Sequence, residues 1–284
     1  MLVDKPSGLT SHDVVDRVRH ALKTRAVGHT GTLDPFATGL LVVLIGRATR
    51  LARFVENQPK RYLATARLGV QTTTDDLTGE VIASALGAEP VPEVRVREEL
   101  ASLLGTHAQR PPVYSAKRIA GERSYRRARR GETVELAEVT VTVHDIELVH
   151  YRPPELCFRA VVSPGTYLRA IARDLGTQLG VGAHLTALRR EAIGSLQIED
   201  AVSLDQVGPA AVLSAQSVLR DLPSIDLDEV AREAVVHGRA VRDSGDVGLR
   251  GSGEAVALME GGELIAIARV DDGWLRPTVV LETA

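Results

Sequence analysis

Apolar and polar positions along the chain follow two different spacings, which together predict a mixture of helices and strands. Residues 40–45 form an unbroken apolar run that is typical of a buried strand. Strand-like patterns also occur over residues 61–69, 134–149 and 156–162, and shorter apolar segments follow at 185–188 and 193–198. These stretches predict the strands of one large sheet.

Helical spacing appears between the predicted strands. Ser11 is expected to cap a helix whose apolar positions are Val14, Val15, Val18 and Leu22. Further helices are expected over residues 48–55, within 90–105 and over 167–179. The inward positions of the helix within 90–105 are expected to be Val94, Leu100, Leu103 and Leu104. Because helices and strands do not form regular βαβ repeats, the sequence predicts an α+β fold with a mixed, mostly antiparallel sheet flanked by helices.

The composition changes after about Pro223. Glycine-rich turns near residues 245–253 and 261–262 separate three short apolar segments, 255–259, 264–270 and 274–280, and one helix is expected over 228–236. This pattern predicts a small β-rich domain over residues 223–284, appended to a larger domain over 1–222. A chain of 284 residues is long enough for two such units.

Composition narrows the class of protein. No apolar run approaches the roughly 20 residues that a membrane helix needs, and the chain does not open like a signal peptide, so we expect a cytoplasmic protein. The single cysteine, Cys157, excludes an internal disulfide and is expected to be a buried strand residue. The eight histidines show no metal-binding spacing, so no metal site is expected.

The net charge of −3 argues against a nucleic-acid partner, but the charges are unevenly distributed. Between Arg110 and Arg130 a basic strip contains Arg110, Lys117, Arg118, Arg123, Arg126, Arg127, Arg129 and Arg130. A helix carrying Arg123, Arg126, Arg127 and Arg130 would present one continuous positive face. Such a face suits a phosphate backbone, although a solvated surface is the alternative.

The stretch from Gly28 to Leu41 combines glycines and hydroxyl residues with one carboxylate, Asp34. Pro35 biases Asp34 toward an extended backbone, which would place the carboxylate at a sharp boundary between elements. The same Asp-Pro pair also fits the start of a helix, with the aspartate as its N-cap. The residues alone leave both interpretations open.

Several segments in order resemble the TruB family of pseudouridine synthases. The similarity covers roughly the first 195 residues, by the order and context that motif matches require. The matching segments are Leu2-Val3-Asp4-Lys5-Pro6-Ser7-Gly8, the stretch 28–41, Lys60-Arg61-Tyr62, Arg67-Leu68-Gly69, Pro111-Pro112-Val113-Tyr114-Ser115-Ala116, Gly165-Thr166-Tyr167-Leu168-Arg169, Ala183-His184-Leu185 and Leu188-Arg189-Arg190. Family members usually carry a few more apolar residues before Leu2, so either a clipped first strand or a start codon assigned too late is expected.

This resemblance implies a fold and an activity. The implied fold is the pseudouridine synthase fold, with a small C-terminal domain similar to a PUA-type RNA-binding module. The implied reaction converts uridine to pseudouridine at position 55, in the T loop of tRNA, without a cofactor. The basic segment, about residues 110–138, would be an insertion that clamps the T-arm stem-loop. The resemblance also implies a monomer that needs no protein partner and that assists tRNA folding.

The resemblance also implies roles for individual residues. Asp34 would be the catalytic carboxylate, Arg169 the cation that keeps it ionised, and Tyr62 the ring that stacks on the flipped uracil and assists removal of the C5 proton. Leu188 would line the pocket, His29 would fill the gap left in the RNA loop, and Lys5 would support the site. Taken singly, each fits an ordinary core, turn or surface position.

Two other functions remain open from the sequence. A non-catalytic RNA-binding or RNA-folding protein would keep the basic clamp and lack the chemistry, a hypothesis that the presence of Asp34, Tyr62 and Arg169 disfavours. A nucleoside glycosidase would need a second, water-activating acid, and none stands beside Asp34 in its motif.

Overall fold

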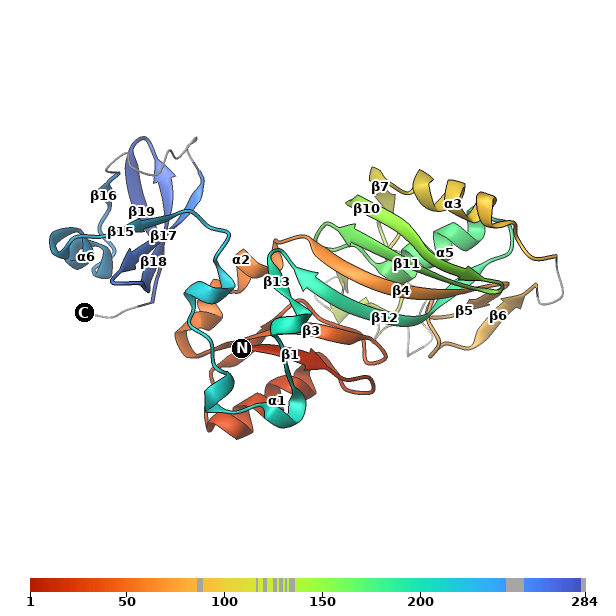
Figure 1. Ribbon diagram of the computed structural model, residues 1–284, viewed down its shortest axis with the longest axis horizontal. Helices are drawn as coiled ribbons and strands as arrows, with labels where there is room; N and C mark the ends of the chain where they lie inside the picture. Colours follow the sequence, from red (N-terminus) through yellow and green to blue (C-terminus); the bar gives the residue numbers. More distant parts are fainter. Residues whose placement is uncertain are drawn as a thin grey trace.

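The computed structural model describes residues 1–85, 89–115, 117–119, 122–124, 127, 130, 132, 136–243 and 253–281. Within these residues the chain forms a large sheet and a smaller C-terminal sheet, which lie at opposite ends of the molecule in Figure 1. Two short hairpins accompany them, β5 (Val70–Thr72) with β6 (Val81–Ser84), and β8 (Arg118–Ile119) with β9 (Glu122–Arg123).

Ten strands of the described residues form the large sheet. They are β1 (Leu2–Lys5), β2 (Val27–Thr30), β3 (Thr38–Ile45), β4 (Lys60–Leu68), β7 (Gly105–Gln109), β10 (Val139–Arg152), β11 (Glu155–Val162), β12 (Ala183–Ile193), β13 (Leu196–Gln197) and β14 (Val202–Ser203). Their order is β14-β1-β3-β12-β4-β11-β10-β7, with β2 beside β3 and β13 beside β12. Within this sheet β1 and β14 pair in parallel, as do β12 and β3, and the other pairs are antiparallel. The predicted mixed, mostly antiparallel sheet is confirmed.

Strand β3 explains the apolar run at 40–45. Leu40 and Val42 pack into one hydrophobic cluster, whereas Leu41 and Val43 pack into another on the opposite face. Because alternate side chains of a strand point to opposite faces, a strand covered on both sides must be apolar at every position. The cluster on one face includes Leu51, Val55 and residues of the C-terminal sheet, and the cluster on the other face includes residues of helix α1 (Ser11–Leu22).

Helix α1 begins one residue earlier than the predicted cap implies. Thr10, not Ser11, is the N-cap: its hydroxyl accepts from the Asp13 amide at 3.1 Å, and the Asp13 carboxylate accepts from the Thr10 amide at 2.7 Å. This reciprocal capping box satisfies two backbone donors at the helix start. Ser11 is therefore the first helical residue, and it is buried.

Helices α3 (Glu93–Ser102) and α5 (Leu168–Gln178) pack against the large sheet through one shared hydrophobic cluster. The predicted inward face of α3 was partly wrong. Leu100 and Leu103 are buried, but Val94 is 63% and Leu104 55% exposed, and Val96 takes the inward position instead. Before them, residues predicted as one helix divide into a 3₁₀ segment η1 (Gly46–Leu51) and α2 (Ala52–Glu56).

The smaller sheet has the strand order β15-β17-β18-β19-β16. Its strands are β15 (Ser224–Asp226), β16 (Val241–Arg242), β17 (Ala255–Glu260), β18 (Glu263–Asp271) and β19 (Trp274–Val280), and α6 (Glu229–Val236) packs on it. The three predicted strands and the helix are confirmed, and β15 and β16 are additional. The β-rich C-terminal region is therefore as predicted.

The smaller sheet is fastened to the β3 end of the larger one. Apolar residues of β17, β18 and β19 share a cluster with those of β3 and α2. The guanidinium groups of Arg47 and Arg50 donate to the carbonyl oxygens of Leu281 and Val280, at 2.9 and 2.6 Å. A shared apolar core and charged hydrogen bonds both oppose independent movement of the two sheets.

The remaining 3₁₀ segments among the described residues are η2 (Ile198–Asp200), η3 (Leu204–Gln206), η4 (Pro209–Ala211) and η5 (Gln216–Val218).

Three expectations for the middle of the chain change. Arg123 lies in β9, so the predicted arginine helix does not include it, and Arg126 lies outside the described residues. The strand expected from residue 134 begins at Val139 as β10, with 133–135 outside the described residues. Cys157 is a free thiol in β11 but is only half-buried, because its side chain lies on the less covered face of the sheet. No helix among the described residues is long and apolar enough to cross a membrane.

Candidate active site

Asp34 lies in the loop that joins β2 to β3, and this loop is not helical. The Ala37 amide donates to the Asp34 carbonyl at 3.1 Å and closes a turn, which excludes the helix-start interpretation. Ser11 of α1 holds the loop from behind, because its hydroxyl accepts from the Leu33 amide at 2.9 Å. The carboxylate therefore projects from a fixed turn.

A close approach of two strands fixes the other end of this loop. Gly39 pairs with Arg190 where β3 runs parallel to β12, and its φ is +104°. A Cβ atom at this position would lie 2.3 Å from the Arg190 carbonyl oxygen, so only glycine fits. The sequence shows the glycine, but only the strand pairing shows why it is needed.

Arg169, in the first turn of α5, is the ionic partner of Asp34. Its Nε lies 3.0 Å from Oδ2 of Asp34, and its side chain is 4% exposed. Nη1 lies 3.2 Å from Oδ2 of Asp76 and donates to the Thr74 carbonyl at 2.8 Å, while Nη2 donates to the Tyr114 carbonyl at 2.9 Å. A guanidinium held on all sides in this way is fixed in one orientation.

Asp76 is a site residue that the motif comparison did not single out. Its Oδ1 accepts from the hydroxyl groups of Thr74 and Thr78, at 2.7 and 2.6 Å, and from the Thr78 amide at 2.9 Å. The signal in the sequence is the polar loop around residues 72–80, which alone fits a solvated turn. Burial of its aspartate becomes visible only when Arg169 is placed against it.

One cavity of about 280 Å³ collects the residues that were predicted to carry the chemistry. Asp34, Tyr62, Arg169 and Leu188 all line it. Tyr62 on β4 and Leu188 on β12 come from adjacent antiparallel strands, and both are more than nine-tenths buried. Other lining residues are Gly31, Thr32, Leu33, Lys60, Val162, Ser163, Gly165, Thr166, Tyr167, Leu168 and Arg190.

The cavity changes the ionisation of Asp34. Burial raises the pKa of this carboxyl group above its ordinary value, and the nearby Asp76 charge adds to the rise. The Arg169 charge opposes it and is the largest influence that favours the carboxylate. A raised pKa next to a specific charge partner, in a cavity, is typical of a functional site.

Lys5 and His29 lie near the loop but are not among the described residues that line this cavity. Lys5 is fully buried, and its ammonium donates to the carbonyl groups of Pro6, Leu9 and Pro35. Burial lowers the pKa of Lys5 to about 8. His29 lies half-buried on β2, and its Nδ1 has no hydrogen-bond partner in the part of the chain that the structure describes. Burial lowers the pKa of its ring. In the structure Lys5 braces the Asp34 loop.

Two arginines of the basic strip, the half-buried Arg127 and the exposed Arg130, are paired with local acids. Nε of Arg127 lies 2.8 Å from Glu132. Arg130 lies 2.6 Å from Glu122 and 2.7 Å from Glu132. Water and salt screen ion pairs at a protein surface, so an incoming phosphate can replace the carboxylates.

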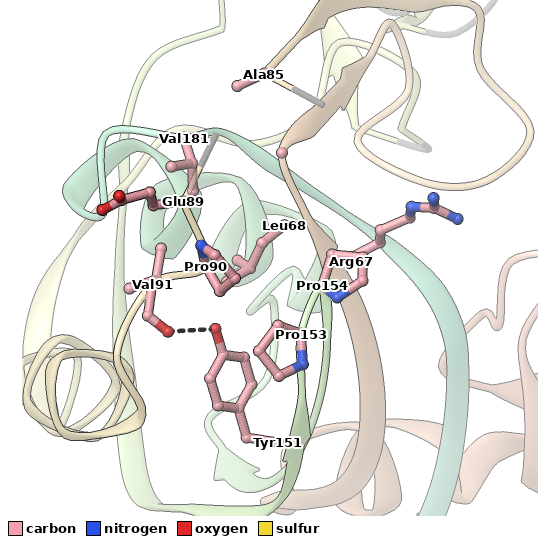
Figure 2. A pocket seen from close by; sticks show the side chains of 11 residues that line it. Arg67, Leu68, Ala85, Glu89, Pro90, Val91, Tyr151, Pro153, Pro154 and Val181 are labelled. Atoms are coloured by element: carbon pink, nitrogen blue, oxygen red, sulfur yellow. Dashed lines mark hydrogen bonds between the residues drawn. The ribbon is translucent and has the colours of Figure 1, made fainter. Parts of the chain in front are cut away.

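A second cavity, of about 360 Å³, is larger but lacks comparable chemistry. Figure 2 shows its lining, which includes Val91, Tyr151 and the prolines Pro153 and Pro154. The Tyr151 hydroxyl donates to the Val91 carbonyl at 2.7 Å, so this polar group of the wall already has a hydrogen-bond partner. In Figure 2 the guanidinium of Arg67 points away from the other labelled side chains. Among the described residues, no group of three or more His, Cys, Asp or Glu side chains could hold a metal ion.

Comparison with known proteins gives consistent matches along the chain. Residues 19–168 match the family model "TruB family pseudouridylate synthase (N terminal domain)", and residues 169–230 match "tRNA pseudouridylate synthase B C-terminal domain". The tRNA pseudouridine synthase B of Thermobifida fusca (strain YX) is 43% identical over 99% of this chain and 97% of that protein. That of Aquifex aeolicus (strain VF5) is 37% identical over 99% of this chain and 98% of that protein.

Solved structures show the same fold. One chain of a "Cbf5-Nop10-Gar1 Complex" is 26% identical with a TM-score of 0.76, covering 99% of this chain and 84% of that one. A chain of an "H/ACA RNP bound to a substrate RNA containing 2'-deoxyuridine" is 23% identical with a TM-score of 0.75, with the same coverage. At that identity the second likeness shows the fold alone.

Proposed function

Because the chain belongs to the TruB family of pseudouridylate synthases, we propose that it converts uridine to pseudouridine at position 55, in the T loop of tRNA. The observation that carries the proposal is the shared cavity, in which Asp34, Arg169 and Tyr62 meet from a loop, a helix and a strand. The protein would act as a cytoplasmic monomer without a cofactor. Residues 1–222 would form the catalytic domain and 223–284 a PUA-like domain.

The reaction breaks the bond between N1 of uracil and C1′ of the ribose, rotates the base and joins C5 to C1′. A carboxylate facing the sugar can stabilise or trap positive charge at C1′, or remove a proton from the sugar. Asp34 would do this, since it is the one carboxylate among the described residues that line the cavity. Arg169 would keep it ionised although it is partly desolvated.

Tyr62 would position the base. Its ring, 7% exposed, can stack on uracil, and its hydroxyl can assist removal of the C5 proton. Leu188 lies on the strand beside it and would exclude water. The uridine must leave its loop to reach them, at a cost of a few kcal/mol that is lowest for bases already unstacked. His29 and the clamp arginines Arg123, Arg126, Arg127 and Arg130 would stabilise the opened RNA.

The contacts of Asp76, the other carboxylate near Arg169, argue against glycoside hydrolysis. An inverting glycosidase needs a second acid roughly 6.5–9.5 Å from the first, with a water molecule between them. Asp76 is not among the described residues that line the cavity, and its oxygen atoms already bind Arg169, Thr74 and Thr78. RNA folding activity, in contrast, can coexist with catalysis, and the Asp34→Asn variant would separate the two activities.

The test is incubation of unmodified tRNA, labelled with tritium at C5 of uridine, with wild type and Asp34→Asn. Wild type should release tritium and form pseudouridine, and the variant should be at least about a thousandfold slower. Asp16→Asn is the matched control, because Asp16 also pairs with an arginine, Arg19, but on an exposed helix surface. Release of free uracil, or normal turnover by Asp34→Asn, would contradict the proposal.

A further inference from the structure

Two buried cations in the cavity have no carboxylate partner among the described residues. Lys60 is 8% and Arg190 1% exposed, and both line the cavity. Arg169, the third cation of the lining, is already paired with Asp34 and Asp76. Buried cations are usually paired, because desolvation of an uncompensated charge costs several kcal/mol. This part of the wall therefore carries an excess of positive charge.

Both side chains are held by carbonyl groups that leave donors unused. The Lys60 ammonium donates to the carbonyl groups of Glu56 and Gln58, at 2.8 and 2.9 Å, so one of its three N–H groups has no partner among the described residues. In Arg190, Nε donates to the Leu40 carbonyl at 2.7 Å and Nη2 to that of Gly31 at 3.0 Å, which leaves the donors of Nη1.

The side chains of Arg190 and Lys60 meet at Gly31. A Cβ atom built on this glycine would lie 3.5 Å from Nη1 of Arg190 and 3.5 Å from Cε of Lys60. The φ of Gly31 is +81°, so glycine is also required by the backbone. The two cations thus lie at one place on the wall, at the start of the loop that presents Asp34.

The charge on this wall is costly unless an anion binds there. Burial and then the Arg190 charge lower the pKa of Lys60 to about 8, although the Glu56 charge opposes this. A nucleotide in the cavity offers one kind of anion, the phosphate groups on either side of its ribose. The carbonyl oxygens of uracil are neutral and would compensate little of this charge.

We propose that Lys60 and Arg190 form a phosphate subsite that holds the RNA backbone next to the flipped uridine. This inference rests on the proposed function and adds a positioning role to it. With the sugar facing Asp34, one of its two flanking phosphates would reach the cations at Gly31. Gripping that phosphate would fix the ribose against the carboxylate while the uracil is free to rotate.

The test uses three T-arm stem-loop RNAs: one unmodified, one with a neutral methylphosphonate on the 5′ side of the target uridine, and one with it on the 3′ side. Dissociation constants are measured by fluorescence anisotropy for wild type and Lys60→Met. In wild type, one methylphosphonate should weaken binding roughly tenfold, as expected for loss of a charge-assisted hydrogen bond. Lys60→Met should bind the unmodified RNA roughly tenfold more weakly and lose almost nothing further with that same methylphosphonate.

Two further variants separate this role from a structural one. Lys60→Gln keeps an amide donor for the carbonyl groups of Glu56 and Gln58 but removes the charge. It should therefore also lose almost no further affinity with that methylphosphonate, and it replaces Lys60→Met if the methionine variant folds poorly. Lys117→Met is the control, because Lys117 lies on the exposed basic strip and donates to the Ala137 carbonyl. It should alter binding of all three RNAs by the same factor.

The subsite would be overturned if the losses of RNA affinity were independent. In that case the fold-loss caused by each lysine variant would multiply with the fold-loss caused by either methylphosphonate. Unchanged binding of the unmodified RNA by both lysine variants would also overturn it. Pseudouridine formation by wild type is measured on the unmodified RNA in parallel. If wild type is inactive, the proposed function fails whatever the binding results; if it is active without coupling, only the subsite fails.

Discussion

Asp34 and Arg169, which are 135 positions apart in the chain, form an ion pair with Nε of the arginine 3.0 Å from Oδ2 of the aspartate. The two side chains differ in their surroundings: Arg169 is 4% exposed, whereas Asp34 is 36% exposed. The arginine is therefore fixed in the protein interior, and the carboxylate faces the cavity. The Arg169 charge can therefore influence the ionisation of Asp34 without blocking access to the carboxylate.

This pair predicts a shift in the pH dependence of turnover. Asp34 must be ionised to act, so kcat/KM should fall as pH falls through its pKa, which burial places above the ordinary value. Arg169→Gln removes the charge that lowers this pKa, so the pKa should rise and the acidic limb should move to higher pH. Arg173→Gln, which breaks pairs with Asp75 and Asp174, should leave the limb in place. A limb unmoved in Arg169→Gln would refute this electrostatic role.

The ion pair between Asp76 and Arg169 predicts that Asp76 affects activity, although it is not among the described residues that line the cavity. Asp76→Asn removes the charged partner of Arg169 Nη1, and the arginine should then reorient or shift toward Asp34. We expect kcat to fall about 10- to 100-fold, as for loss of a hydrogen bond between charged groups. Asp75→Asn is the control, since the Asp75 carboxylate pairs with Arg173 and not with Arg169. Steady-state kinetics on tRNA would measure both, and equal effects would contradict the prediction.

The close approach at Gly39 predicts a stability difference between two glycines with positive φ. Gly39→Ala would force a Cβ atom to 2.3 Å from the Arg190 carbonyl oxygen, so it should lower the free energy of unfolding by about 3 kcal/mol or more. Gly8→Ala has open space around the new methyl group and should cost only the roughly 1–2 kcal/mol of a left-handed backbone. Urea denaturation of the two variants makes the comparison. Similar losses of unfolding free energy in the two variants would mean that β3 and β12 can move apart at little free-energy cost.

The elements that sequence could predict are those whose burial is set along the chain itself. The run 40–45 showed β3 because both faces of that strand are covered, and the C-terminal strands followed their glycine-rich turns. Helix faces were predicted less accurately, since Val94 fits the helical spacing of α3 but is exposed. The local cap at Thr10 was misplaced by one residue because two hydroxyl residues stand together, and only the Asp13 contact distinguishes them.

For the site, the resemblance named Asp34, Tyr62, Arg169 and Leu188, and the structure places all of them on one cavity. It did not single out Asp76, Lys60 or Arg190. The local sequence does not reveal that these residues are buried, because their burial depends on strand and loop pairings far apart in the chain, such as β3 with β12. A charged residue in a strand or turn is expected at the surface until such a pairing is known.

The ion pairs of the basic strip predict how the protein responds to salt. If Arg127 and Arg130 exchange their pairs with Glu132 and Glu122 for RNA phosphates, counterions are released when tRNA binds. Replacing both arginines by alanine should then reduce the slope of log Kd against log salt concentration by about 0.7–0.9 for each lost contact.

The control for this prediction is a pair of arginines in the same chemical state on another surface. Arg95 and Arg97 of α3 are exposed and paired with Glu99 and Glu93, so replacing both by alanine removes as much charge and as many ion pairs. If the clamp acts through general attraction alone, both double variants should weaken tRNA binding alike, because net charge acts at long range. If the strip contacts the backbone directly, only the Arg127 and Arg130 variant should change the slope. An unchanged slope in that variant would remove the clamp from the mechanism.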